Sequence, residues 1–286
     1  MRQTILALSL LPALASAQVF QHVSVEQFSA SDGQELQMAG LSRNGRYAFT
    51  TSPTRCGLVR IDLDNRERQV ITNDLGAGIN PIISPDGKTV RHSIDTFDEN
   101  HIRHTEWKTV APAPPRGEQQ SLDSSTPRSV APSSPSGEPA REVSINTSLR
   151  IELTIDGMTR TLAPNGDDEE TNYLWASLSP DGTRILYFVS DEGAYVCNLD
   201  GEDLQFIAYD CQAPQWYDDQ TIVGMRTRDD GEFIRESYLV AYTLQGDRQQ
   251  LSQPSQMLMY PFCAAEAGRI VSANPKGELF ILNVTR

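Results

Sequence analysis

The four-residue sequence Ser-Pro-Asp-Gly occurs twice, at residues 84–87 and 179–182, and Ser-Arg-Asn-Gly at residues 42–45 is a weaker copy of it. Proline at the second turn position fixes φ, aspartate or asparagine can accept a hydrogen bond from nearby backbone, and glycine takes the positive φ that ends the turn. A tight turn that recurs along one chain predicts a repeated structural unit. The turn residues are Ser42, Asn44 and Gly45; Ser84, Pro85, Asp86 and Gly87; and Ser179, Pro180, Asp181 and Gly182.

The spacing of the turn glycines sets the period of the repeat. Gly45 and Gly87 lie 42 positions apart, and Gly87 and Gly182 lie 95 apart. The larger interval holds either two ordinary periods or one period with an insertion, and we favour the insertion. Two further frames keep the spacing without the motif, with Asp219 and Gly268 in place of the turn glycine. A period of about 40 to 50 residues is typical of β-propeller blades.

Each frame has the same internal order. A short apolar segment precedes the turn, a β-rich run follows it, and a second run and usually a short third piece come after. This order predicts a four-stranded antiparallel sheet. The last frame ends at "ELFILNVTR" without a fourth strand, while residues 19–29 alternate polar and apolar without a frame of their own. We therefore expect an all-β fold: a single propeller of five four-stranded blades, closed by the N- and C-terminal strands in one blade.

A Pro/Ser-rich segment at about residues 111–141 interrupts the repeats. It holds seven of the 17 prolines and almost no large apolar residues. Such a composition buries too little apolar surface to offset the entropy of ordering, so we expect a disordered insertion. If the segment instead hides a degenerate repeat, the ring has six blades.

The first 17 residues read as a secretory signal peptide. Arg2 supplies a positive start, an apolar stretch follows, and Ala15-Ser16-Ala17 is a small-residue cleavage pattern. The apolar stretch is about half of the roughly 20 residues that a membrane span needs. We expect residues 18–286 to form the propeller domain, exported to the periplasm or secreted, and not to be an integral membrane protein.

Charge and cysteine content narrow the classes of partner. The formal net charge is −14, which disfavours nucleic acid and anionic membrane surfaces as partners. The cysteines allow three disulfide pairings and show no CxxC spacing of a metal site, so their pairing stays open. Cys197 lies in an alternating strand pattern, where a buried free thiol is the simplest interpretation. The four cysteines are Cys56, Cys197, Cys211 and Cys263.

These repeats resemble the TolB-type, WD-like propeller family, in which Ser-Pro-Asp-Gly precedes a hydrophobic strand. The matching stretches are "IISPDGKTV", "LSPDGTRILYFVSDEGAYVCNLDGEDL" and "LSRNGRYAFTTS" followed by "GLVRIDLDNRERQVIT". The chain also resembles exported propellers of this type through "GAGIN" at residues 76–80 and "APQWYDD" at residues 213–219. The resemblance covers the chain from about residue 38 to its end, except the Pro/Ser-rich segment. It implies the propeller fold and a role as a binding platform.

No motif indicates catalysis, and we expect no catalytic, cofactor-binding or metal site. The chain has no Gly-x-Ser-x-Gly, HExxH, P-loop or strand-linked GxGxxG. His101 and His104 would point to opposite faces of a strand, so with His92 they are expected to fill strands or the surface. The acidic runs at 167–170 and 229–231 are expected to be solvated turns. Trp107, Trp175 and Trp216 are expected to pack between blades.

We expect an exported, non-enzymatic, monomeric scaffold that binds a protein or an envelope component, on a face that the sequence does not identify. The alternative is a carbohydrate-active or hydrolytic enzyme with carboxylates at the central channel. A third possibility is a structural role for the 111–141 segment as a spacer or docking tail. Paired carboxylates in a channel cleft would favour the enzyme, whereas an apolar ring face would favour protein binding.

Overall fold

The structure is a computed structural model, and it describes residues 18–28, 36–112 and 141–286. The predicted signal peptide and nearly all of the Pro/Ser-rich segment lie outside the described residues. Within the described part of the chain, no helix is long and apolar enough to cross a membrane.

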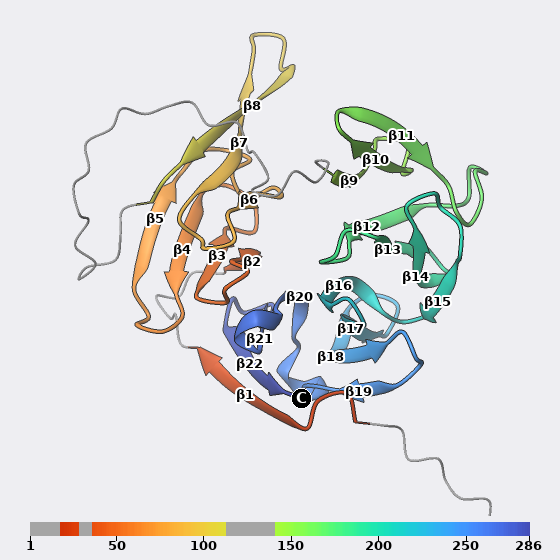
Figure 1. Cartoon of the computed structure of the whole chain (residues 1–286). Coiled ribbons are helices and arrows are strands. Elements are labelled where there is room, and N and C mark those ends of the chain that lie inside the picture. The colour runs from red at the N-terminus through yellow and green to blue at the C-terminus, as the bar shows by residue number, and fades with distance from the viewer. Residues whose placement is uncertain (1–17, 29–35, 113–140) are drawn as a thin grey trace, which may run out of the picture.

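Six antiparallel sheets surround a central axis, and each is a blade of one ring (Figure 1). The all-β propeller is confirmed, and its six blades match the second of the two expected counts rather than the preferred five.

The strands follow in blade order. Blade 1 has β2 (Gln37–Leu41), β3 (Tyr47–Thr51), β4 (Leu58–Asp62) and β5 (Arg68–Thr72); blade 2 has β6 (Ile82–Ile83), β7 (Val90–Phe97) and β8 (Arg103–Val110). Blade 3 has β9 (Arg141–Ile145), β10 (Ile151–Ile155) and β11 (Met158–Leu162); blade 4 has β12 (Tyr173–Leu178), β13 (Arg184–Val189), β14 (Gly193–Asn198) and β15 (Gln205–Ala208). Blade 5 has β16 (Gln212–Asp218), β17 (Thr221–Asp229), β18 (Ile234–Thr243) and β19 (Arg248–Gln250); blade 6 has β20 (Met259–Ala264), β21 (Arg269–Ala273), β22 (Leu279–Thr285) and β1 (His22–Phe28). Two short 3₁₀ helices, η1 (Pro254–Gln256) and η2 (Ala265–Ala267), flank β20.

The two ends of the described chain close the ring in blade 6, as expected. β1 pairs antiparallel with β22 along its whole length, from His22 opposite Thr285 to Phe28 opposite Leu279. Because β1 covers the outer edge of β22, that blade exposes no long unpaired strand there.

The turns that define the repeat have one hydrogen-bond pattern. At residues 84–87, the Ser84 hydroxyl donates to the Asp86 carboxylate and accepts from the Thr89 N–H, while the Gly87 N–H donates to the Ser84 carbonyl. The hydrogen bond from Ser84 lowers the pKa of Asp86. Gly87 has φ of +69°, a conformation that glycine adopts without cost. Each such turn joins the first and second strands of its blade.

Blades 2 and 3 explain why the count is six. An arginine of one blade donates to the turn carbonyl of the next: Arg269 to Gly45 at 3.0 Å and Arg184 to Asp219 at 2.6 Å, each from the first residue of a second strand. Arg141, the first residue of β9, does the same to Gly182 at 2.9 Å. β9 to β11 are therefore the second to fourth strands of their own blade, so the 95-residue interval spans two blades.

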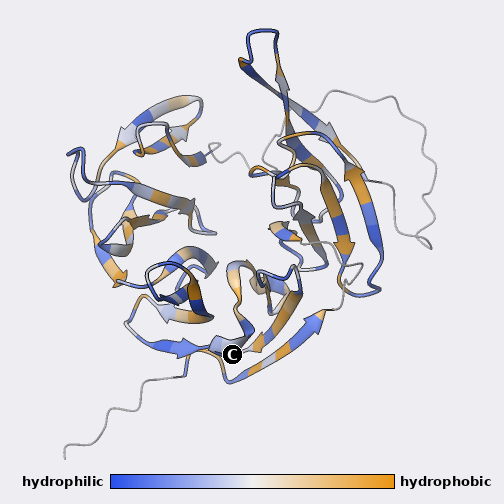
Figure 2. Cartoon of the chain, turned by 180° about the vertical axis from the view of Figure 1, so that it is seen from behind, coloured by the Kyte–Doolittle hydropathy of each residue, from blue (hydrophilic) through white to orange (hydrophobic). Residues whose placement is uncertain are grey.

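Apolar side chains pack between successive blades. Clusters of buried residues join blades 1 and 2, 3 and 4, 4 and 5, 5 and 6, and 6 and 1. Figure 2 shows hydrophobic and hydrophilic residues interleaved along the strands of the blades. Among the described residues, none of these clusters joins blade 2 to blade 3. Those two blades flank residues 113–140.

Candidate functional site

The ring has two ends with different connections. The corner face carries the turns from the first to the second strand and from the third to the fourth. The loop face carries the turns from the second to the third strand and the connections between blades. The repeat turns that the sequence singles out, around Gly45, Gly87 and Gly182, all lie on the corner face.

The first strand of most blades carries a bulge near its loop-face end. The pairing register between the first and second strands shifts after Met38, Leu174, Gln212 and Met259. Non-glycine residues with positive φ occur at equivalent places four residues before the position of the turn serine. They are Asn80 (45°), Trp175 (52°), Ala213 (44°) and Tyr260 (52°).

Recurrence of this rare conformation in four blades shows that it belongs to the repeat and not to one residue. Three of the four residues precede a proline, a context that normally disfavours helical φ and ψ. A non-glycine residue in the left-handed region carries strain of roughly 1–3 kcal/mol. Trp175, Ala213 and Tyr260 lie within the bulges of their strands, and Asn80 lies just before β6. All four line the same hollow, while the residue type differs from blade to blade.

A hollow of about 370 Å³ lies where these positions meet. Its volume is within the range of roughly 300–1,000 Å³ that is usual for ligand sites. The equivalent positions of five blades all contribute: Met38, Asn80, Trp175, Ala213 and Tyr260. The remaining lining residues are Ala39, Arg55, Gly78, Pro81, Gln215, Pro261 and Phe262. The hollow is therefore built from blades 1, 2, 4, 5 and 6.

The polar groups of the lining have few partners within the protein. In the described part of the chain, the side chains of Asn80, Trp175, Gln215 and Tyr260 make no hydrogen bond. Trp175 and Tyr260 are partly exposed, at 36% and 45%. These donors and acceptors are available to a bound molecule.

The Gly76-Ala77-Gly78 segment fixes one side of the hollow. A Cβ at Gly76 would lie 2.3 Å from an Asp95 carboxylate oxygen, and one at Gly78 would lie 2.1 Å from Thr51 Oγ1. Only glycine permits this approach, and Ala77 between them is fully buried. The segment that resembles the "GAGIN" motif thus packs between blades 1 and 2 and leads directly into Asn80.

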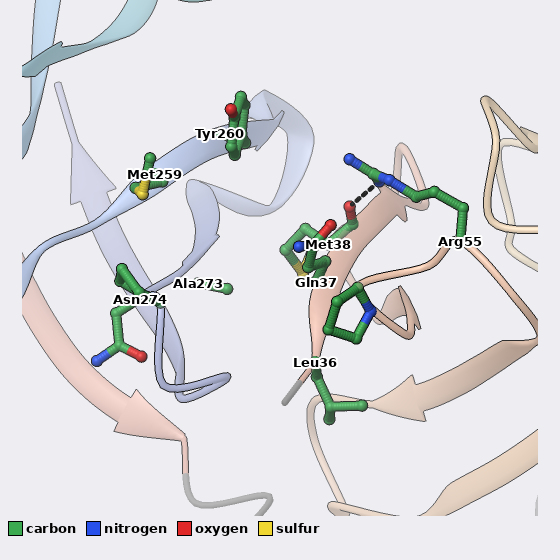
Figure 3. Close-up of a pocket in the computed structure, with 10 residues that line it drawn as sticks. Leu36, Gln37, Met38, Arg55, Met259, Tyr260, Ala273 and Asn274 are labelled. Atoms are coloured by element: carbon green, nitrogen blue, oxygen red, sulfur yellow. Dashed lines mark hydrogen bonds between the residues drawn. The ribbon is translucent and has the colours of Figure 1, made fainter. Parts of the chain in front are cut away.

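A narrower groove of about 80 Å³ runs from this hollow between blades 1 and 6. The two cavities share Met38, Arg55 and Tyr260. Figure 3 shows the Arg55 side chain reaching from the β3–β4 loop toward Met38, with Tyr260 on the β20 side. The rest of the groove is lined by Leu36, Gln37, Pro53, Met259, Ala273, Asn274 and Pro275.

The loops of the loop face carry exposed acidic residues and also most of the exposed large apolar side chains. Of the large apolar side chains exposed in the described residues, ten lie in or beside its loops and two lie in turns of the corner face. The two corner-face residues are Met158 and Leu204. Those of the loop face are Leu75, Ile79, Phe97, Ile102, Leu149, Trp175, Tyr209, Phe233, Ile234 and Tyr260.

Other residues singled out by sequence lie away from the hollow. His101 lies in the β7–β8 turn with φ of 60°, and not on a strand as expected. His104 pairs with Asp98 at 3.1 Å, and His92 is fully buried. Asp168 accepts hydrogen bonds from Thr171 within its own turn, and these lower its pKa. No group of histidine, cysteine or acidic residues suited to a metal occurs among the described residues.

The tryptophans divide into two kinds. Trp216 is 8% exposed and packs between blades 4 and 5, as expected. Trp175 contacts Phe188 edge-on at 5.3 Å but opens into the hollow, because the bulge turns it toward the channel. Trp107 is 47% exposed on β8, which has only β7 beside it in the described chain. The expectation of packing between blades was therefore wrong for Trp175 and Trp107.

The four cysteines are free, and none lines the hollow. Cys197 is buried as expected, and desolvation raises the pKa of its thiol to about 12. A thiol with this pKa stays protonated at neutral pH and is a poor nucleophile.

The sequence matches no protein-family model, and it matches no curated protein. The fold does resemble solved structures. A putative TolB from Agrobacterium tumefaciens superposes with a TM-score of 0.53 at 17% identity, covering 92% of this chain and 98% of the other. Streptogramin B lyase gives a TM-score of 0.46 at 11% identity over 94% and 100%. An oligogalacturonate lyase from Vibrio parahaemolyticus gives 0.43 at 11% over 85% and 76%. The TolB likeness confirms the TolB-like propeller fold that the repeats implied, and identities this low are evidence of fold alone.

Proposed function

We propose that this protein is an exported, non-enzymatic propeller that binds a protein or an envelope component through its loop face. The observation that carries the proposal is the hollow at the centre of that face. Its lining combines aromatic and aliphatic side chains with unpartnered amides, and Arg55 is its single charged residue among those described. Sites of this composition recognise ligands by contact and hydrogen bonding.

The enzymatic alternative requires acidic groups in the channel. Glycosidase chemistry uses a pair of carboxylates about 5–10 Å apart. The described lining of the hollow contributes no aspartate or glutamate. Aromatic and apolar side chains that line the hollow, such as Trp175, Tyr260 and Phe262, instead support a binding role.

The proposal includes export and a monomeric state, and it excludes nucleic acid. The signal-like composition of residues 1–17 supports export. The net charge of −14 argues against binding of nucleic acid.

Site-specific photocrosslinking in the native envelope tests the binding role. A photoreactive phenylalanine replaces Tyr260 on the loop face or, as a matched control, Leu204 on the corner face, which is similarly exposed at 46%. We expect a discrete adduct from position 260, lost when Trp175→Ala is added, and none from position 204. Adducts from position 204 alone would contradict the proposal, as would turnover of a glycan by a protein that forms no adduct.

A further inference from the structure

Arg55 is a cation without a matching anion. Most arginines of the described chain pair with a carboxylate, as Arg46 does with Asp62 at 3.0 Å. Among the described residues, Arg55 has no ion-pair partner, and its guanidinium makes a single hydrogen bond, 3.5 Å long, to the Met38 carbonyl. A guanidinium has five N–H donors. Most of its binding capacity is therefore unused.

The backbone that carries Arg55 is held from several directions. The Arg55 N–H donates to the Ser52 carbonyl at 2.9 Å, and the Arg55 carbonyl accepts from the Gly78 N–H at 3.1 Å. Ser52 Oγ accepts from the Cys56 N–H at 3.1 Å. Arg55 itself has φ of 59°. These bonds fix the start of a long side chain, so less entropy is lost when it binds.

The groove beside Arg55 is mainly apolar. Met38, Met259 and Ala273 line it from blades 1 and 6, together with prolines at both rims. Arg55 belongs to its lining, and Figure 3 shows its guanidinium beside Met38. One molecule can therefore place an apolar group in the groove and an anion on Arg55 at the same time.

We propose that Arg55 binds a carboxylate of an extended peptide segment, and that the apolar side chain next to that carboxylate enters the groove between blades 1 and 6. This inference rests on the proposed function, because it names what the loop face recognises. A guanidinium binds carboxylate through charge-assisted, bidentate hydrogen bonds. Ala39, the extra residue of the bulge in β2, borders the hollow into which this groove opens, and β2 is the first strand of its blade, whose free edge suits the main chain of a peptide. The carboxylate is the C-terminus of the partner, because the last residue carries its carboxylate and its side chain on one Cα and Arg55 itself lines the groove.

Peptide titration followed by NMR tests the inference on the full-length protein. The reporter is the indole N–H signal of Trp175, assigned through Trp175→Phe. The probes are acetyl-Ala-Ala-Gly-Leu with a free C-terminus, the same peptide as its C-terminal amide, and acetyl-Ala-Ala-Gly-Leu-Asp-Gly amide with its Asn analogue. We expect the peptide with a free C-terminus to bind about tenfold more tightly than its amide. Discrimination confined to the Asp and Asn peptides would reject the C-terminus as the occupant.

Variants separate the role of Arg55 from that of the surface as a whole. Arg55→Gln should reduce the difference between acidic and neutral peptides to within about twofold, and Arg55→Lys should keep part of it. Arg43→Ala, on the corner face, should leave it unchanged. Thermal unfolding of each variant establishes that it folds.

Either of two results would overturn the inference: equal binding of acidic and neutral peptides, or tighter binding of galacturonate than of any peptide. A third decisive result is Arg55→Gln retaining the full discrimination. If photocrosslinking from position 260 persists alongside such a result, the proposed function stands and only the role of Arg55 is rejected.

Discussion

On the corner face, arginines of one blade donate to the turn of the next, whereas on the loop face Arg55 stands in a hollow without a carboxylate beside it. The same strands build both ends, so the difference lies in how their side chains are used. Arg269 binds the Gly45 carbonyl and Asp64, and Arg160 binds Asp200 and the Leu199 carbonyl. Satisfied polar groups of this kind join blades. Unsatisfied ones around an apolar hollow are available to a ligand.

The two tryptophans of the first strands give the largest expected contrast. Trp216→Ala should lower the free energy of unfolding by about 3–5 kcal/mol, because it empties a buried site between blades 4 and 5. Trp175→Ala should cost less than about 1 kcal/mol, since its ring is already partly exposed. Urea unfolding measures both. Similar losses for the two variants would show that the loop face is as structural as the corner face.

Two glycines with positive φ test how tightly the corner face is packed. Gly87 has φ of +69° and a Cβ there would lie 2.5 Å from the Tyr47 ring, whereas Gly157 has φ of +80° with no atom within 4 Å of such a Cβ. Gly87→Ala should cost about 2 kcal/mol or more, from strain together with overpacking. Gly157→Ala should cost only about 1 kcal/mol, from strain alone. Equal costs in thermal unfolding would reject the role of packing at the turn.

The contribution of Asp86 to stability, which depends on pH, is expected to be smaller than the effects above. The hydrogen bond from Ser84 lowers the folded-state pKa of Asp86 from its usual 3.8. A carboxylate with a lowered pKa stabilises the fold above its unfolded-state pKa, and this contribution is lost as pH falls through the folded-state value. Asp86→Asn should therefore cost about 0.5–1 kcal/mol at pH 7, a modest loss because the side chain is exposed.

Denaturant unfolding of wild type and Asp86→Asn from pH 7 to pH 2 measures this difference. The difference in unfolding free energy between the two proteins should narrow below pH 3.8 and vanish below the folded-state pKa of Asp86. A gap that is constant over the whole range would mean that charge is not involved.

Exposed ion pairs of the corner face should matter least. Arg43 and Glu266 are 2.9 Å apart, but their side chains are 59% and 61% exposed. Arg43→Ala should change the free energy of unfolding by less than about 0.5 kcal/mol. Arg269→Ala should cost about 1 kcal/mol, since this less exposed side chain donates to two acceptors. A larger loss of unfolding free energy for Arg43→Ala than for Arg269→Ala would show that side-chain exposure does not determine the strength of these contacts.

The repeat turn was sufficient to predict the blades, because its hydrogen bonds are local and its residue types are specific. The closure was predicted from the incomplete last frame and the alternating segment at residues 19–29. The blade count needed more. The sequence Ser134-Pro135-Ser136-Gly137 resembles the turn motif and lies 50 residues after Gly87 and 45 before Gly182, but serine replaces aspartate and the flanking residues are rich in proline. These four residues lie outside the described part of the chain. Their spacing was the signal for a sixth frame.

The hollow was not predicted, because its members are unrelated residue types brought together only by ring closure. Met38, Asn80, Trp175, Ala213 and Tyr260 share a place in the frame, four residues before the turn serine or its replacement. Counted back from the turn glycines, this rule finds Met38, Asn80 and Trp175 in the sequence. In the last two frames, counting from Asp219 and Gly268 misses Ala213 and Tyr260 by one residue, and only the strand pairing corrects it. Arg55 could not be found in this way, since it comes from a loop between the second and third strands and reaches the hollow through its contact with Gly78.

Around the hollow, one backbone conformation recurs in several blades while the residue type that adopts it differs. Because asparagine, tryptophan, alanine and tyrosine all occupy the same left-handed geometry, these places behave as interchangeable sockets on a fixed frame. If the hollow binds a partner as proposed, exchanging these residues among blades should change its selectivity without altering the sheets. Variants at these positions can therefore be combined freely, because the strained main chain that presents the side chains is the same in each of these blades.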